Sequence, residues 1–251
     1  MDKEFWKNNA KEYNGVLVVW VDQATDPLLK IGNSSGVCFA MARKFAIDYQ
    51  KGAPGPYEFV NGIRDASLVP PGTSRIPKEY LDLQAAYQAN LDQYKQSLAQ
   101  LKTQIDEAEL EQKKALLADL IKLKDVQVKK LYGSTLDAFI QFKELNVIAS
   151  ETILDKMKAI VTDKGPSYFV VGMRGDHGGH GIAFGFRPDL SSPPNFPGIF
   201  EYFDANLGLF VFGSEEELRK FFSLDVWSAL YGTLDYNKFD IASFTAVPGK
   251  R

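Results

Sequence analysis

The sequence predicts an α+β fold, with helices in the first part of the chain and an antiparallel β-meander in the last third. Apolar residues recur at helical spacing over 37–49 and again over 79–132. After residue 167, short runs of aromatic and β-branched residues alternate with turns rich in glycine and proline. The 251 residues, of which 45% are hydrophobic, provide apolar material for a large core. We therefore expect one domain over 1–251, with the segment 79–132 inserted into it.

The composition excludes several classes of protein. Cys38 is the only cysteine, so no intrachain disulfide is expected, and two histidines, His177 and His180, are too few for a thiolate or imidazole metal cluster. We expect no metal and no cofactor. The 29 Lys and Arg residues nearly balance the 32 Asp and Glu residues, so charge does not favour binding to nucleic acid. The longest apolar run, Val16–Val21, is too short for a transmembrane segment, and residues 1–4 lack the features of a signal for Sec export.

The first third of the chain predicts a buried strand followed by a helix. A short helix or loop leads to 15–21, a β-branched run without polar alternation, which is typical of a strand buried on both faces. The polar residues of 32–36 then precede the helical pattern of 37–49 and are expected to cap its free N–H groups. Cys38 therefore falls in the first helical turn. The glycine- and proline-rich stretch 52–77 is expected to interrupt regular structure.

The segment 79–132 contains neither glycine nor proline and predicts a helical hairpin. One helix of this length would extend about 80 Å, well beyond one domain, so we expect an antiparallel turn near Asp106–Lys114. Its charged surface is open to two interpretations, a solvated structural element or a surface that contacts the substrate, another partner or a second copy. After Gly133 we expect a helix to about Lys158. Apolar residues step by threes and fours along the coiled-coil seam of Tyr87, Leu91, Tyr94, Leu98, Leu101, Ile105 and Ala108.

The last third predicts four short strands and a capped helix. The turns between the strands lie at 174–179 and 187–197. Ser214 and Glu217 form the pair of a capping box, which predicts that a helix begins at 215. The strands are expected at 167–173, 180–186, 198–204 and 209–212.

Cys38 is a candidate nucleophile. A free thiol has a pKa near 8.5, and the positive end of a helix together with a neighbouring imidazolium lowers that value. Acyl transfer also requires hydrogen-bond donors for the tetrahedral oxyanion. The backbone N–H of Cys38 and the side-chain amide of Asn33, five residues upstream, are candidates for that role.

His180 and Asp204 are candidates for the base and for the acid that orients it. His180 begins a predicted strand and has glycine on both sides, which leaves space for its ring. Asp204 ends the next strand, and antiparallel neighbours bring the end of one strand beside the start of the other. Taken singly, each of the three residues also fits an ordinary role: a buried small residue for Cys38, a loop residue for His180 and a turn former for Asp204.

Together, three segments resemble the YopT-type family of papain-like cysteine proteases, many of which are bacterial effectors delivered into host cells. The resemblance implies a helical lobe packed on an antiparallel sheet, with the site in the cleft between them, and it gives Asn33 the spacing of the family's oxyanion residue. This sequence has Ala205 where the family has proline, and the hairpin 79–132 has no counterpart in the minimal fold. The segments are Ser35-Gly36-Val37-Cys38-Phe39-Ala40-Met41, Gly179-His180-Gly181-Ile182-Ala183 and Phe203-Asp204-Ala205-Asn206-Leu207-Gly208-Leu209-Phe210-Val211-Phe212.

The resemblance predicts a thiol peptidase in which Cys38 attacks, His180 transfers the proton and Asp204 orients His180. It implies a soluble effector that reaches the host cytoplasm by a route other than Sec and cleaves a host signalling protein, such as a small GTPase or a kinase. Two alternatives use the same residues differently. A glutamine deamidase or transglutaminase would share the triad and the thioester. A non-enzymatic binding protein would bury Cys38 and work through the hairpin.

Overall fold

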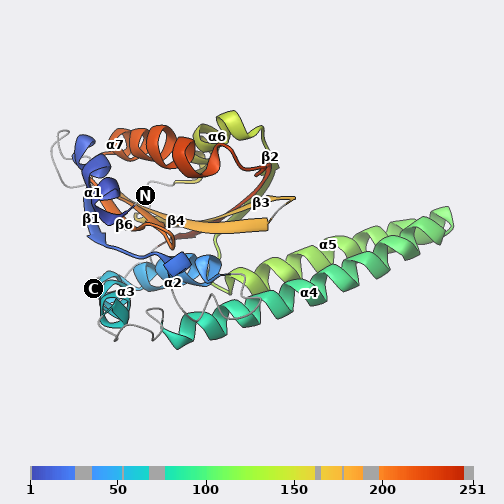
Figure 1. Cartoon of the computed structure of the whole chain (residues 1–251). Coiled ribbons are helices and arrows are strands. Elements are labelled where there is room, and N and C mark those ends of the chain that lie inside the picture. The colour runs from blue at the N-terminus through green and yellow to red at the C-terminus, as the bar shows by residue number, and fades with distance from the viewer. Residues whose placement is uncertain are drawn as a thin grey trace.

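The protein is built on one antiparallel β-sheet with helices on both faces (Figure 1). A computed structural model describes residues 2–25, 36–52, 54–67, 77–161, 165–176, 178–188 and 198–245. These residues form a seven-stranded sheet in the order β1-β6-β5-β4-β3-β7-β2. The strands are β1 Val16–Val19, β2 Ala138–Lys143, β3 Ser167–Gly175, β4 Gly178–Pro188, β5 Gly198–Asp204, β6 Gly208–Phe212 and β7 Lys238–Thr245.

The helices divide between the two faces of the sheet. One face carries α1, α6, α7 and the π-helical segment that continues α7, and the other carries α2, α3 and the base of the α4–α5 hairpin. As predicted, Ser214 caps α7, and its hydroxyl accepts a hydrogen bond from the Glu217 N–H at 3.2 Å. The helices are α1 Lys3–Glu12, α2 Cys38–Gln50, α3 Pro54–Ser67, α4 Lys78–Glu107, α5 Leu110–Tyr132, α6 Asn146–Ile160, α7 Glu215–Lys220 and the π-helix Phe221–Tyr231.

Two aromatic cores, one on each face, hold the layers together. Successive residues of a strand point to opposite faces, so β3 sends Phe169 into the core beneath α6 and Tyr168 into the core beneath α2. On the second face, Phe45 of α2 stacks on Phe203 of β5 at a centroid distance of 6.0 Å. The α+β prediction is confirmed, as are the four strands predicted in the last third, which are β3 to β6.

The first predicted strand is present, and the burial expected for it is only partly met. β1 lies at the edge of the sheet and pairs with β6 alone among the described strands, and Val16 is 59% exposed. The run is apolar because helices cover both faces even at this edge, with Leu17 packed against one core and Val19 within the other. Burial on both faces therefore does not require a central strand.

Two other elements differ from the predictions. The stretch 52–77 contains the helix α3. Prolines at 54 and 56 are compatible with it because they fall in its first turn, where the backbone N–H groups have no intrahelical acceptor to lose. Residues 53 and 68–76 lie outside the described part of the chain. Within the expected helix 133–158, residues 138–143 form the edge strand β2. A short apolar run fits both the helical period of 3.6 residues and the strand period of two residues. Its pairing with β7, a strand that the sequence pattern did not reveal, makes this run a strand.

The α4–α5 pair forms a long antiparallel hairpin that projects from the sheet domain (Figure 1). The helices break at Ala108 and Glu109, inside the region where the sequence predicts the turn. At the base, Tyr80 and Tyr132 are buried against α2 and the sheet, whereas Leu110 at the tip is 74% exposed. None of the described helices is both long and apolar enough to cross a membrane.

Candidate active site

Helix α2 brings Cys38 directly against strand β4. Cys38 is the first residue of α2, and it is buried with 6% of its surface exposed. The close approach depends on Gly181, because a Cβ atom at that position would lie 2.9 Å from the Cα of Phe39. Since real Cβ contacts do not reach that distance, the absence of a side chain at 181 allows the helix start to lie on the strand beside His180.

The start of α2 is capped by side chains from distant segments. Its N-cap residue is Val37, whose side chain makes no capping bond, and residues 32–35, which the sequence predicts to cap the helix, lie outside the described residues. The Gln23 side-chain oxygen instead accepts the Val37 N–H at 2.8 Å, and the Gln84 oxygen, from α4, accepts the Ala40 N–H at 3.1 Å. These two glutamines satisfy donors that the first turn of a helix leaves free.

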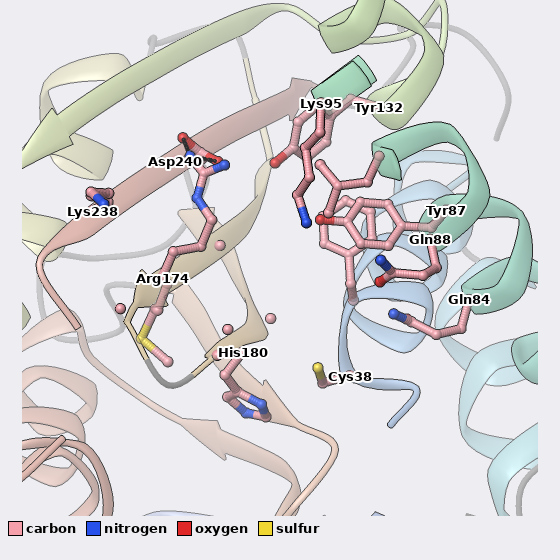
Figure 2. Close-up of a pocket in the computed structure, with 18 of the residues that line it drawn as sticks. Cys38, Gln84, Tyr87, Gln88, Lys95, Tyr132, Arg174, His180, Lys238 and Asp240 are labelled. Atoms are coloured by element: carbon pink, nitrogen blue, oxygen red, sulfur yellow. Dashed lines mark hydrogen bonds and ion pairs between the residues drawn. The ribbon is translucent and has the colours of Figure 1, made fainter. Parts of the chain in front are cut away.

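His180 lies on β4 and contacts both other candidate residues. Its Nε2 atom is 2.9 Å from Oδ1 of Asp204, which lies on the neighbouring strand β5 opposite Ile182. The ring also lies beside the Cys38 sulfur, close enough for each group to shift the pKa of the other. Figure 2 shows the ring and the sulfur side by side at one end of a pocket. Since Nε2 faces the carboxylate, Nδ1 is the nitrogen available to the sulfur.

The carboxylate of Asp204 is fully buried and accepts four hydrogen bonds, one of them from His180. The Tyr202 and Tyr231 hydroxyls donate to Oδ2 at 2.7 and 2.5 Å, and the Asn206 N–H donates to Oδ1 at 2.8 Å. The Tyr231 ring also stacks on the His180 ring, with centroids 5.3 Å apart. These contacts hold the carboxylate in a single orientation and fix the imidazole ring beside it.

The electrostatics favour an ion pair between Cys38 and His180. Burial raises the pKa of the Cys38 thiol, but the charge and hydrogen bond of His180 and the Gly181 N–H outweigh it and hold that pKa below its ordinary value. Burial lowers the pKa of His180, but the charges of Asp204 and Cys38 outweigh it and raise the pKa to about 10. Burial likewise raises the pKa of Asp204, and His180 outweighs it, so the carboxyl is ionised. These shifts favour a thiolate beside an imidazolium over a neutral thiol beside a neutral ring.

Gln23 connects the strand side of the site, which carries Asp204, to the helix that carries Cys38. The sequence pattern did not reveal this role. Its N–H donates to the Ala205 carbonyl at 2.8 Å, and its side-chain amide donates to Asn206 Oδ1 at 2.7 Å. Because the same side chain accepts the Val37 N–H, it ties the turn after Asp204 to the start of the nucleophile helix.

The structure describes only part of the expected oxyanion site. The Cys38 N–H lies in the first turn of α2, where a backbone N–H has no intrahelical acceptor. Asn33 lies outside the described residues, as does His177. Among the described residues, no three His, Cys, Asp or Glu side chains are grouped so that they could hold a metal ion.

Cys38 and His180 line a cavity of about 620 Å³ that continues away from them between the sheet and α4. The glycine-rich ends of β3 and β4 form one wall, and one face of α4 forms the opposite wall (Figure 2). Tyr87 of α4 stacks on Phe39 at 4.0 Å and so fixes this wall beside the nucleophile. The hairpin is therefore part of the cavity and not merely attached to the domain.

Comparisons with known proteins give a similarity among solved structures. No protein-family model matches the chain, and no curated protein matches it. Among solved structures, the chain is similar to the crystal structure of the Pseudomonas avirulence protein AvrPphB, with a TM-score of 0.41 and 12% sequence identity. The similarity covers 83% of this chain and 89% of that chain.

Proposed function

We propose that this chain is a cysteine peptidase of the papain-like, YopT type, with Cys38, His180 and Asp204 as its triad. The observation that supports this most strongly is that His180 bonds to a buried carboxylate and lies beside the sole cysteine at one end of a cavity. A binding protein with Cys38 as a core residue would not require a thiolate and an imidazolium to face each other.

In the proposed reaction, the Cys38 thiolate attacks a peptide carbonyl carbon, a C–S bond forms and the carbonyl oxygen becomes an oxyanion. The Cys38 N–H and the Asn33 amide donate to that oxygen. The His180 imidazolium transfers its proton to the leaving nitrogen as the C–N bond breaks, which leaves a thioester. Neutral His180 then takes a proton from water, hydroxide attacks the thioester, and the C–S bond breaks to restore the thiolate and release a carboxylic acid. Asp204 holds His180 in orientation throughout.

The motifs around the triad support assignment to the effector proteases of bacteria. The segment Phe203–Phe212 has the family's acid, turn and strand, and in this fold the carboxylate that begins the turn is the one bonded to His180. By that resemblance the substrate is a host signalling protein, with small GTPases and kinases among the classes to test, and the protein acts in the host cytoplasm.

Thiol reactivity tests the proposed nucleophile. An ordinary thiol with a pKa of 8.5 becomes roughly 75-fold more reactive between pH 6 and pH 8, since reactivity follows the thiolate fraction. The lowered pKa of Cys38 predicts a flatter response of iodoacetamide labelling over that range. The raised pKa of His180, about 10, predicts that an ion pair between the two would persist until pH approaches 10. His180→Ala should restore the steep response. A native thiol that resists labelling at both pH values would exclude the proposal.

The reaction itself is tested by mass spectrometry of host-cell extract treated with the purified protein. New peptide N-termini that are absent with Cys38→Ala indicate a peptidase. Release of ammonia without chain cleavage indicates the deamidase or transglutaminase that uses the same thioester. The Cys38→Ala protein should keep the melting temperature of the wild type within a few degrees, because the change in side-chain volume is small.

A further inference from the structure

We propose that α4 forms a substrate-binding subsite of the cavity, where Lys95 selects an acidic side chain three to five residues from the scissile bond. This inference rests on the proposed peptidase function and adds a substrate class to it: an extended segment of protein that carries Asp or Glu at a fixed distance from the cleaved bond.

The length of the α4 wall matches a short extended peptide. The cavity-lining residues of α4 lie at positions 84, 87, 88, 91 and 95, a spacing that places them on one face of the helix. From Gln84 to Lys95 the helix rises about 16 Å at 1.5 Å per residue. An extended peptide covers that distance in about five residues at 3.3 Å each. Because the Lys95 side chain leans back toward the helix N-terminus, its ammonium group lies closer to Cys38 than its Cα does.

The opposite wall has room for a peptide backbone. Five glycines of β3 and β4 line the cavity, and at two of them added side-chain atoms would meet no close neighbour. At Gly172 the nearest atom to a Cβ would be 3.7 Å away, and at Gly178 none lies within 4 Å. Glycines that are not required by close packing leave space for another chain to approach. The cavity is therefore shaped for an extended chain between the glycine-rich wall and the lining face of α4.

Gln84 provides a donor at the end of this wall nearest to the nucleophile. Its side chain is 7% exposed, and its oxygen is occupied by the Ala40 N–H. No acceptor for its amide nitrogen lies among the described residues, and Figure 2 shows that nitrogen turned toward Cys38. A backbone carbonyl of a bound peptide beside Cys38 would give this nitrogen an acceptor.

The charge at the far end favours an acidic side chain. Arg174 is neutralised within the cavity wall by Asp240, at 2.7 Å. The anion nearest to Lys95 among the described ion pairs is Asp92, at 3.8 Å and largely exposed, and Figure 2 shows the Lys95 ammonium turned into the pocket. Lys238 adds a second cation to the lining, and Asp176, at the β3–β4 turn, offsets one of the two. A bound carboxylate would give Lys95 the partner that Asp92 provides only weakly.

Cleavage of a diverse peptide library by the full-length protein tests the subsite, with cleaved products sequenced by mass spectrometry. The wild type should enrich Asp and Glu at one position three to five residues from the cleaved bond. Lys95→Glu should replace that preference with Lys and Arg, and kcat/KM for the best acidic peptide should fall about tenfold, with a smaller loss at high salt. Lys102→Glu, the same change on an exposed part of α4 outside the cavity, should leave the cleavage profile unchanged.

The outcomes separate the two proposals. Cleavage that shows no acidic preference at these positions, or a preference that Lys95→Glu leaves unaltered, would overturn the subsite while the peptidase stands. If the wild type and Cys38→Ala give the same library profile, the peptidase fails and the subsite with it. Circular dichroism of Lys95→Glu should match that of the wild type, because Lys95 is exposed on its helix.

Discussion

The two sides of the active site are stabilised in different ways. One side, here called the sheet wall, is the pair of strands that carries His180 and Asp204, and the other, the helix wall, is the start of α2 that carries Cys38. On the sheet wall, His180 and Asp204 lie on adjacent strands, and the tyrosines that bond to Asp204 are buried beside it. On the helix wall, Cys38 depends on side chains from remote parts of the chain, since Gln23 and Gln84 supply the acceptors for the first turn of α2. The sheet wall holds its orientation through its own hydrogen bonds. The helix wall is positioned by other segments, including the hairpin.

The largest predicted effect comes from the sheet wall. Asp204→Asn removes the charge that raises the pKa of His180 and leaves the amide facing a ring N–H, so the imidazole loses its orientation. We expect kcat/KM to fall on the order of 10⁴-fold, by analogy with the orienting acid of other triads. Peptide cleavage assays measure this. Activity within threefold of the wild type would show that the sheet wall does not require its buried carboxylate.

The second prediction separates the two walls. In Gly181→Ala the new methyl group would lie 2.9 Å from the Phe39 Cα and 3.1 Å from its N, so α2 must move away from β4. A displacement of about 1 Å at reacting groups costs on the order of 10²-fold in rate. We expect that loss in kcat/KM and slower iodoacetamide labelling at pH 6. Gly213→Ala, where the nearest atom is 3.5 Å from the new methyl group, is the matched control and should behave as the wild type.

A smaller effect is predicted for the remote cap. Gln84→Leu keeps the side-chain volume but leaves the buried Ala40 N–H without an acceptor, which costs about 1–3 kcal/mol. We expect urea denaturation to show that loss of stability, with kcat/KM reduced several-fold. Gln93→Leu on the exposed side of α4 should change neither quantity. If Gln84→Leu matches this control, the hairpin does not support the nucleophile helix.

The smallest effect is predicted for the far half of the hairpin. Residues 100–117, replaced by a short glycine linker, include the exposed Leu110 and Leu117 and none of the residues that line the cavity. We expect kcat/KM for short peptides to stay within twofold of the wild type. A loss of tenfold or more would mean that the tip, and not only the base, supports the helix wall.

The sheet wall was largely predictable from the sequence, and the helix wall was not. The positions of β4 and β5 follow from local pattern, although β4 extends two residues further at each end than predicted, and antiparallel pairing then brings Asp204 to His180. Tyr202 carries a signal as well, because residues two apart on a strand share a face with Asp204. Tyr231, by contrast, reaches the carboxylate from a π-helix, and Gln23 and Gln84 cap a helix 14 and 44 residues away from the bonded N–H groups. Contacts of this kind depend on tertiary packing and leave no periodic trace in the sequence.

The length of α4 also affects how the size of the molecule must be measured. Its 30 residues extend about 45 Å, whereas a compact domain of 251 residues has a radius of gyration of about 18 Å. A monomer with such a projection diffuses more slowly than a sphere of equal mass and elutes early from a gel-filtration column. Its subunit number therefore has to come from light scattering or sedimentation equilibrium, which report mass independently of shape.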